Sequence, residues 1–277
     1  MSQTLLSATA MLRPVEVLPP ALATALPDLP ALDTPPETRH RMFRLDQDMI
    51  ITIDGPAASG KTATAEALAQ ELGLQVLSTG AMYRCATAIA MEHNIAREHT
   101  FRLIEVVRAS HMHFDWHTKT PEGRPSPEII AFGRSYAKRI TDEDVTSRVS
   151  EYSEVIQLRE LMVGMQRDIS RAHKRLVSEG RDQGSVVFPD SRVKFYLFAS
   201  ARVRAERRRQ QLLAKKGIDR SVEELETEIA ARDENDRKKP YGALVCPPGA
   251  QSIDSSVMTL DDVVATMRTY VIAQARH

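Results

Sequence analysis

The chain has 277 residues, and its 37 lysines and arginines balance 37 aspartates and glutamates, so the formal net charge is zero. A neutral chain creates no overall field that favours nucleic acid or an anionic membrane, so any basic site must be local. Two cysteines exclude a disulfide framework, and no apolar run reaches the roughly 18 residues of a membrane-spanning helix. We therefore expect a cytoplasmic protein with no nucleic-acid and no membrane partner.

The first ordered element is expected only after a long N-terminal segment. Seven of the 15 prolines fall in the first 36 residues, among Ala, Leu and Thr, and no basic stretch precedes an apolar core there. Such a composition cannot build a packed core and differs from a secretory signal. Residues 1–46 are therefore predicted to form a disordered extension.

A βαβ unit is predicted from residue 49. The β-branched run 49–53 favours a buried strand, and residues 74–77 favour the next one. Between them, apolar residues recur at helical spacing from Lys61 to Leu72, and Gly73 stands where a left-handed cap would end the helix. Two strands joined through a helix indicate a right-handed crossover and a parallel sheet covered by helices.

The later elements continue this pattern with one interruption. Helices are predicted at 80–93, 102–110, 142–173, 201–236 and 260–273, and strands at 174–178, 193–199 and 249–254. Between 111 and 140, alternating and turn-rich residues favour short antiparallel strands instead. The predicted fold class is α/β, a parallel sheet flanked by helices. We expect a core of residues 47–110 and 174–277, an inserted domain at 111–173, and a helical lid at about 201–245.

A phosphate-binding loop lies between the first predicted strand and the first predicted helix. Its sequence, Gly55-Pro56-Ala57-Ala58-Ser59-Gly60-Lys61-Thr62, matches GxxxxGK[ST] in full. A chance turn is the alternative, but the strand and the helix on either side are what the motif requires. We expect the loop, through Ala63, to bind ATP, with Lys61 reaching the β and γ phosphates and Thr62 ligating Mg²⁺.

This loop alone leaves the acceptor open, because GTPases, motor ATPases and small-molecule kinases all carry it. No Asn-Lys-x-Asp stretch occurs, which weakens a GTPase interpretation. A strand ending in an acid, as in ATPases, is not obvious either, because the apolar run before Asp182 is short and interrupted by Gly180.

Two further segments indicate a small phosphorylated acceptor. Residues 78–84, Ser-Thr-Gly-Ala-Met-Tyr-Arg, and residues 180–185, Gly-Arg-Asp-Gln-Gly-Ser, each follow a predicted strand and carry an arginine. The first segment taken alone could be a helix N-cap with a surface arginine. Because parallel strands end at one edge of a sheet, Arg84 and Arg181 are expected to converge there as a phosphate-transfer cleft.

With these motifs the chain resembles the bacterial cytidylate kinases. The resemblance spans residue 50 to the C-terminus and rests on five ordered motifs. They are Gly55–Lys61, Thr79–Arg84, Gly180–Asp190, Arg232-Asp233-Glu234-Asn235-Asp236 and Ile253-Asp254-Ser255. It implies ATP- and Mg²⁺-dependent phosphorylation of CMP and dCMP to CDP and dCDP by direct in-line transfer. The large predicted insertion is similar to that family's monophosphate-binding domain.

The resemblance also implies roles for individual residues. Thr79, Arg84, Arg181 and Arg232 would hold the acceptor phosphate or the transferring group, and Asp236 would bind the sugar. Ser150, Arg159 and Asp182 match positions that recognise cytosine. The implied catalytic set is Lys61, Arg84, Arg181, Arg232 and Lys239. Cytosine offers an amine to a carboxylate and its carbonyl and ring nitrogen to donors, whereas uracil presents the reverse pattern.

Departures from the family pattern leave alternatives open. Lys239 stands where the family usually has arginine, Ala243 where it has proline, and Ser78 where it has aspartate. Lysine keeps the charge but loses the bidentate fork, so we expect slower transfer. A P-loop kinase with another small-molecule acceptor and a non-catalytic ATP-binding regulator remain as alternatives. We expect a monomer, and leave the order of preference among CMP, dCMP and UMP open.

Overall fold

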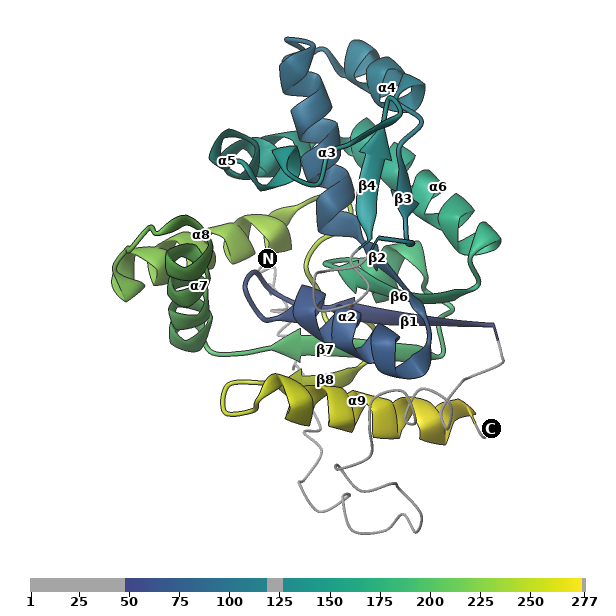
Figure 1. Ribbon diagram of the computed structural model, residues 1–277, viewed down its shortest axis with the longest axis vertical. Coiled ribbons are helices and arrows are strands. Elements are labelled where there is room, and N and C mark those ends of the chain that lie inside the picture. The colour runs from purple at the N-terminus through teal and green to yellow at the C-terminus, as the bar shows by residue number, and fades with distance from the viewer. Residues whose placement is uncertain (1–47, 119–126, 276–277) are drawn as a thin grey trace, which may run out of the picture.

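The computed structural model describes residues 48–118 and 127–275; the expected disordered extension and residues 119–126 of the stretch predicted as short strands lie outside them. A five-stranded parallel sheet runs through the centre in the order β2-β6-β1-β7-β8 (Figure 1). Its strands are β1 Met49–Asp54, β2 Gln75–Ser78, β6 Arg175–Gly180, β7 Val193–Phe198 and β8 Gln251–Asp254. The predicted α/β fold with a parallel sheet is therefore confirmed.

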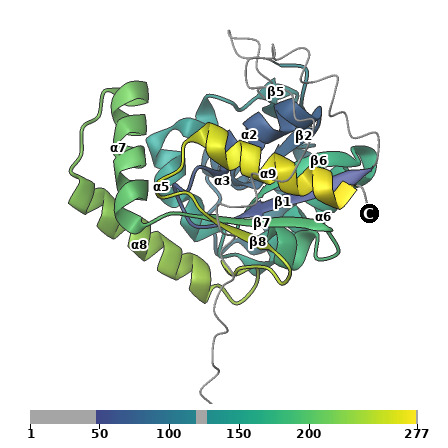
Figure 2. The same cartoon turned by 90° about the horizontal axis from the view of Figure 1, so that it is seen from below.

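Helices α2 (Lys61–Leu72) and α9 (Leu260–Ala275) cover one face of this sheet (Figure 2). Side chains alternate between faces along β1, and Ile51 and Ile53 point to this side, where both are fully buried. They pack in one core with apolar residues of both helices and the neighbouring strands. As predicted, Gly73 ends α2 in the left-handed region, with φ at 66°.

The opposite face carries α3 (Thr79–Glu92) and the inserted segment. That segment holds the antiparallel sheet predicted for it, of β3 His113–Asp115, β4 Glu128–Ala131 and β5 Arg134–Ser135. Its helices are the 3₁₀ turn η2 Arg139–Thr141, α5 Glu143–Tyr152 and α6 Ile156–Ala172. Helix α4, Thr100–Ala109, precedes the segment in the chain. A single helix was predicted for 142–173, but the chain breaks it at residues 153–155. Trp116 Nε1 donates to the Val76 carbonyl at 2.8 Å, which ties β3 to the edge strand β2.

The charged stretch predicted as one helical region folds as two helices, α7 (Ala201–Lys216) and α8 (Val222–Lys238). Gly217 ends α7 at φ 65°, and the Ser221 hydroxyl accepts from Glu224 N to begin α8. The α7–α8 hairpin stands where β1 and β7 end (Figure 1). No helix in residues 48–118 and 127–275 is long and apolar enough to span a membrane.

The strand order decides which segments meet at the carboxyl edge of the sheet. Strand β6 lies between β1 and β2, with Asp54 opposite Gly180 and Ser78 opposite Glu179. The segment after β6 is thus the direct neighbour of the phosphate loop, and the segment after β2 lies one strand further away. A five-residue π-helix, η3 (Gln183–Val187), which the sequence did not indicate, follows β6.

Candidate active site

The phosphate loop leaves β1 through a backbone turn that only glycine can make. A Cβ on Gly55, at φ 154°, would overlap the Leu197 carbonyl of β7. Gly60 takes φ 92° immediately before α2 begins at Lys61. The loop thus presents its amides at a helix N-terminus, where the peptide dipoles favour an anion.

Lys61 is 5% exposed and folds back onto the loop. Its ammonium donates to the Pro56 carbonyl at 2.6 Å and to Ser59 Oγ at 3.3 Å. Burial and then the charge of Arg181 lower the pKa of Lys61 well below its usual value. An ammonium destabilised by neighbouring cations gains the most from an anion placed among them.

A carboxylate beside Thr62 escaped the sequence analysis. Glu179, at the end of β6, accepts from Thr62 Oγ1 at 3.1 Å and from Ser78 Oγ at 2.6 Å. Its backbone carbonyl accepts from Thr79 Oγ1 at 2.9 Å. An acid therefore does end the strand beside the loop, and the search for it failed because it centred on Asp182, beyond Gly180.

Cationic side chains, half-buried at Arg84 and Arg181 and exposed at Arg232, gather at the same edge. Arg84 lies on α3, Arg181 follows β6 and Arg232 lies on α8. Burial lowers the pKa of Arg84 and Arg232, and the charge of Arg181 lowers both further. Arg208 of α7, which sequence analysis did not single out within a run of arginines, acts on the pKa of Arg84 and of Arg232 in the same direction. The mutual repulsion of these side chains favours a bound polyanion.

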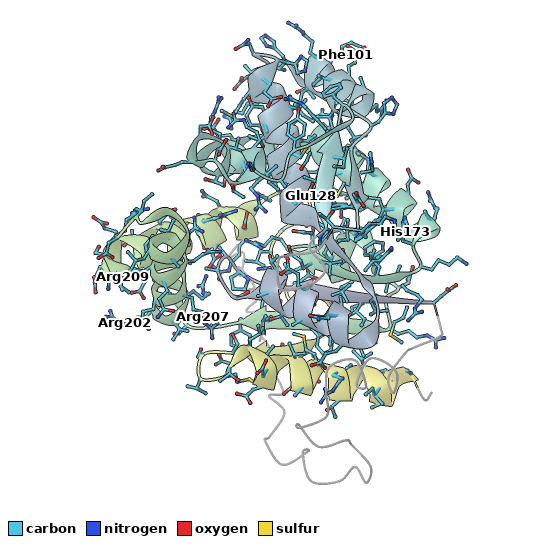
Figure 3. All side chains as sticks on the ribbon, viewed as in Figure 1. Phe101, Glu128, His173, Arg202, Arg207 and Arg209 are labelled. Atoms are coloured by element: carbon cyan, nitrogen blue, oxygen red, sulfur yellow. The ribbon has the colours of Figure 1, made fainter. Side chains whose placement is uncertain are left out.

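Three neighbouring arginines of α7, Arg202, Arg207 and Arg209, make other contacts (Figure 3). Arg202 and Arg209 form exposed ion pairs with Glu223 and Asp219, and Arg207 donates to the Ser255 carbonyl at 2.6 Å. Arg202 and Arg209 thus lie on a solvated helical face, whereas Arg207 ties α7 to the segment after β8.

Asp236 of α8 connects Arg181 of the cation cluster to Lys239. It accepts from Arg181 Nε at 2.9 Å and from Lys239 Nζ at 2.7 Å. Burial opposes its ionisation, but the charges of Arg181 and Lys239 outweigh burial and lower the pKa of Asp236 to about 2. Lys239 also donates to Ser153 Oγ at 3.0 Å, so the end of α8 contacts the segment between α5 and α6.

Arg159 and Asp182 form a buried ion pair in which Arg159 Nη2 lies 2.5 Å from Asp182 Oδ2. The same guanidinium donates to the carbonyls of Ser153 and Gly242, at 3.0 and 3.1 Å. The ring of Tyr83 lies 5.4 Å from it. Two of the predicted base-recognition residues are thus brought together, between the inserted segment and the lid.

Ser150, the third predicted base-recognition residue, joins this group through its backbone. Its carbonyl accepts from Ser153 Oγ at 2.9 Å, and Ser153 in turn contacts Arg159 and Lys239. Ser153, which was not predicted, thus links Ser150 to both Arg159 and Lys239.

The two alanines of the loop and the residue after Thr62 complete the predicted set. Ala58 takes a left-handed φ of 58°, and Ala63 is exposed on the first turn of α2. Ala57 differs from expectation, because its amide donates to Asp233 Oδ1 at 2.9 Å instead of facing the loop interior.

The residues around Thr62 fit a magnesium ion. A hydroxyl and a carboxylate are the hard oxygen donors that Mg²⁺ takes alongside phosphate oxygens and water. Among the described residues, no group of three or more His, Cys, Asp or Glu side chains could hold a metal without such help. A site that is completed by the nucleotide fits this donor set.

With this geometry established, the chain can be compared with known proteins. Its sequence matches the family described as cytidylate kinase over residues 51–273. A cytidylate kinase of Bacillus cereus (strain G9842) is 35% identical over 227 residues, which make up 82% of this chain and 97% of the relative. The chain belongs to the cytidylate kinase family.

Other relatives carry the same name. Cytidylate kinases of Caldanaerobacter subterraneus subsp. tengcongensis and Chloroherpeton thalassium are 37% and 36% identical to this cytidylate kinase family member. The alignments cover 77% and 84% of this chain and 90% and 98% of the relatives. A solved shikimate kinase from Bacteroides thetaiotaomicron covers 83% of this chain at 12% identity, with a TM-score of 0.39.

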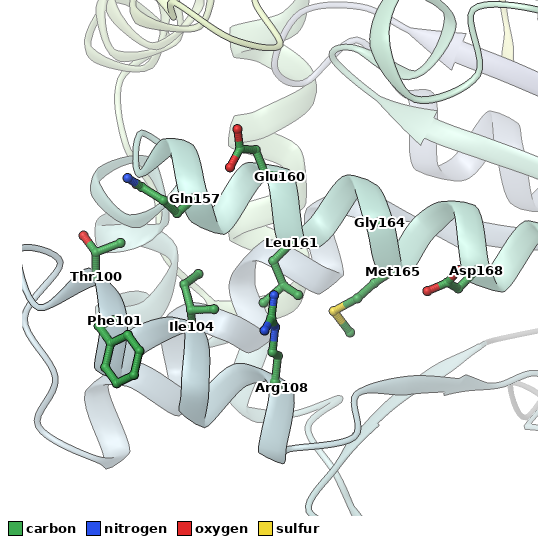
Figure 4. Close-up of a pocket in the computed structure, with 10 residues that line it drawn as sticks. All are labelled: Thr100, Phe101, Ile104, Arg108, Gln157, Glu160, Leu161, Gly164, Met165 and Asp168. Carbon is green, nitrogen blue, oxygen red and sulfur yellow. The ribbon is translucent and has the colours of Figure 1, made fainter.

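A groove of about 770 Å³ in this cytidylate kinase family member lies elsewhere, between α4 and α6 (Figure 4). Phe101 and Ile104 line one wall, and Leu161 and Met165 line the other. None of the predicted site residues lines it. The groove is therefore separate from the cation cluster, and size alone does not locate the site.

Proposed function

We propose that this protein transfers the γ-phosphoryl group of ATP to CMP and dCMP, giving CDP and dCDP. The observation that carries the proposal is the gathering of cations around the buried Lys61, next to the Arg159–Asp182 pair. One part of the site suits phosphates and the adjacent part offers a donor and an acceptor to a base. Family membership supports the same reaction.

The donor occupies the loop in this proposal. Its phosphates are bound by the amides at the start of α2, and Lys61 exchanges its contacts with Pro56 and Ser59 for phosphate oxygens. Mg²⁺ would be held by Thr62 and Glu179, and when bound it neutralises charge on the β and γ oxygens.

The acceptor lies between the inserted segment and the lid. Arg84, Arg181 and Arg232 would bind its phosphate, and Asp236 its sugar. Asp182 would accept from the exocyclic amine of cytosine, while Arg159 donates to the carbonyl or the ring nitrogen. Burial of the pair removes water that would otherwise compete for these hydrogen bonds.

The chemistry is a single in-line displacement. An oxygen of the acceptor phosphate bonds to the γ-phosphorus while the bond from that phosphorus to the β–γ bridging oxygen breaks, and ADP leaves. The arginines and Lys61 stabilise the charge that spreads over the equatorial oxygens. The acceptor phosphate is already largely ionised, so no general base is needed.

Three further expectations belong to this proposal. The protein acts in the cytoplasm and as a monomer. Residues 111–173 serve as the monophosphate-binding domain, with about 201–245 as the lid over the core of 47–110 and 174–277. Neither nucleic acid nor a membrane takes part.

The test is ADP formation by the purified protein with ATP and Mg²⁺, and with CMP, dCMP, UMP or AMP in turn. Turnover fastest with CMP or dCMP is expected. Lys61→Ala should remove turnover while keeping the fold, and Lys174→Ala, an exposed lysine paired with Asp48, should not. ATP binding without turnover on any of these acceptors would overturn the proposal.

A further inference from the structure

The peptide of Ala57, inside the phosphate loop, is held on both sides by side chains of the lid. Its N–H donates to Asp233 Oδ1 at 2.9 Å, and its carbonyl accepts from Arg204 Nη1 at 2.9 Å. The two side chains also pair with each other, with Arg204 Nη1 2.5 Å from Asp233 Oδ2. The Arg204–Asp233 ion pair thus forms hydrogen bonds with both the N–H and the carbonyl of Ala57.

The Arg204–Asp233 pair is buried. The side chains of Arg204 and Asp233 are 7% and 1% exposed, and Arg204 Nε donates to the Ala199 carbonyl at 3.0 Å. A buried ion pair persists only where further hydrogen bonds satisfy its partners, and here the Ala57 peptide supplies two of them. The loop and the pair therefore depend on each other.

Apolar packing joins the loop to the lid as well. Ala57 shares a small core with Ala205 and Leu212 of α7 and with Leu225 and Ile229 of α8. The loop residue is thus part of the interior of the α7–α8 hairpin. The α7–α8 hairpin cannot leave the loop without exposing this core and breaking the two hydrogen bonds to Ala57.

The position of Arg232 gives the contacts of the Arg204–Asp233 pair with Ala57 a functional consequence. Arg232 directly precedes Asp233 on α8 and belongs to the cation cluster with Arg84, Arg181 and Arg208. We propose that Arg204 and Asp233 are positioning residues that hold the phosphate loop and Arg232 in a fixed position relative to each other. The amide of Ala57 then donates to Asp233, and the remaining loop amides bind the donor phosphates.

The inference rests on the proposed use of ATP but is tested by donor binding itself. Asp233→Asn keeps the shape of the side chain and removes the charge, so one of the two contacts, to Ala57 N or to Arg204, is lost. Arg204→Lys keeps the charge and loses the fork that reaches Ala57, Asp233 and Ala199 together. Asp219→Asn is the matched control, because Asp219 pairs with Arg209 in the same hairpin and is exposed.

The measurements are ATP affinity by calorimetry without acceptor, the KM for ATP and for CMP, and the melting temperature. Asp233→Asn is expected to weaken ATP binding on the order of tenfold and to raise the KM for ATP more than that for CMP. Arg204→Lys should do the same to a smaller extent. The double variant should be little worse than Asp233→Asn, because both side chains act on one peptide.

Asp219→Asn should leave both KM values within about twofold of wild type. A lower melting temperature of Asp233→Asn with wild-type ATP affinity and an unchanged ratio of the two KM values would overturn the inference, leaving a purely structural brace. If Asp233→Asn does not fold, Arg204→Lys decides by the same criteria. If the wild type binds ATP but phosphorylates no monophosphate, the proposed function fails while the calorimetry still decides the inference.

Discussion

Arg159 and Asp182 face each other across 2.5 Å, and each side chain is only 5% exposed. The pair is formed between α6 and the segment after β6, and the Gly242 carbonyl of the lid shares the guanidinium. A base that enters this site meets a donor and an acceptor already oriented by each other. In the proposed function, their pairing would make the site selective for a ring edge that offers the complementary groups.

Replacing Asp182 by Asn tests this selectivity. The carboxamide offers a donor as well as an acceptor, so the preference for the cytosine amine over the uracil carbonyl should weaken. We expect kcat/KM for CMP to fall about 100-fold, with a much smaller change for UMP. Asp168→Asn, an exposed residue of α6, is the control, and an unchanged CMP-to-UMP ratio in Asp182→Asn would contradict the assignment.

Gly242 and Gly217 form a matched pair for testing the lid contact. Both have φ +65°, but a Cβ on Gly242 would overlap Arg159 Nη2 and Asp182 Oδ2, whereas nothing lies within 4 Å of one on Gly217. Alanine at either position costs about 1 kcal/mol of backbone strain. Steady-state kinetics should show a KM for CMP raised about tenfold in Gly242→Ala only; equal effects of the two variants on KM would rule out this lid contact.

Glu179→Gln addresses the magnesium site. Glutamine keeps an oxygen for Thr62 and Ser78 to donate to but removes the charge. The Mg²⁺ concentration at half-maximal rate should rise about tenfold, with less change in the KM for CMP. Glu160→Gln, an exposed residue of α6, serves as the control. If the rate of Glu179→Gln depends on the Mg²⁺ concentration as the wild-type rate does, Glu179 does not bind the ion.

Asp54 at the end of β1 predicts a pH dependence of stability. It accepts from the amides of Gln183 and Gly184 at 2.7 Å each, yet burial outweighs these bonds and raises its pKa from 3.8 to about 7. Between these values the unfolded chain has lost a proton that the folded chain keeps. Stability therefore falls as pH rises, by about 1.4 kcal/mol per pH unit and roughly 4 kcal/mol in total.

The comparison of wild type with Asp54→Asn isolates this effect. Urea unfolding at pH 4, 5, 6 and 7 should show the wild type losing stability relative to the variant at each step, whatever the offset caused by the lost acceptor. A difference between the two proteins that stays constant over this range would show that Asp54 is already ionised at pH 4 in the folded protein.

Sequence analysis located the phosphate loop, β1 and α2 because their signals are local: a glycine pattern, a β-branched run and a helical periodicity within some thirty residues. It also predicted that Arg84 and Arg181 meet at one edge, since parallel strands must end together, whereas Arg232 was implied only by the family resemblance. The position of β6 between β1 and β2 did not follow, because strand order is decided by packing across the whole chain.

Glu179 and Asp233 were given no role by the sequence analysis, because their partners lie far away along the sequence. Glu179 meets Thr62 and Ser78 over 117 and 101 positions, and Asp233 meets Ala57 over 176. In the sequence each acid is one charge among 37. A helical charge and a carboxylate at a strand end carry no local signal that separates a site residue from a solvated one.

The core on the α3 side of the sheet has a consequence for how the protein unfolds. Leu77 and Leu176 of the sheet, Met82 of α3, Ile129 of β4 and Leu158 of α6 belong to one continuous buried cluster. The hydrophobic interior of residues 111–173 is therefore continuous with that of α3 and the sheet. Urea should melt both in a single cooperative transition, and residues 111–173 expressed alone should stay unfolded.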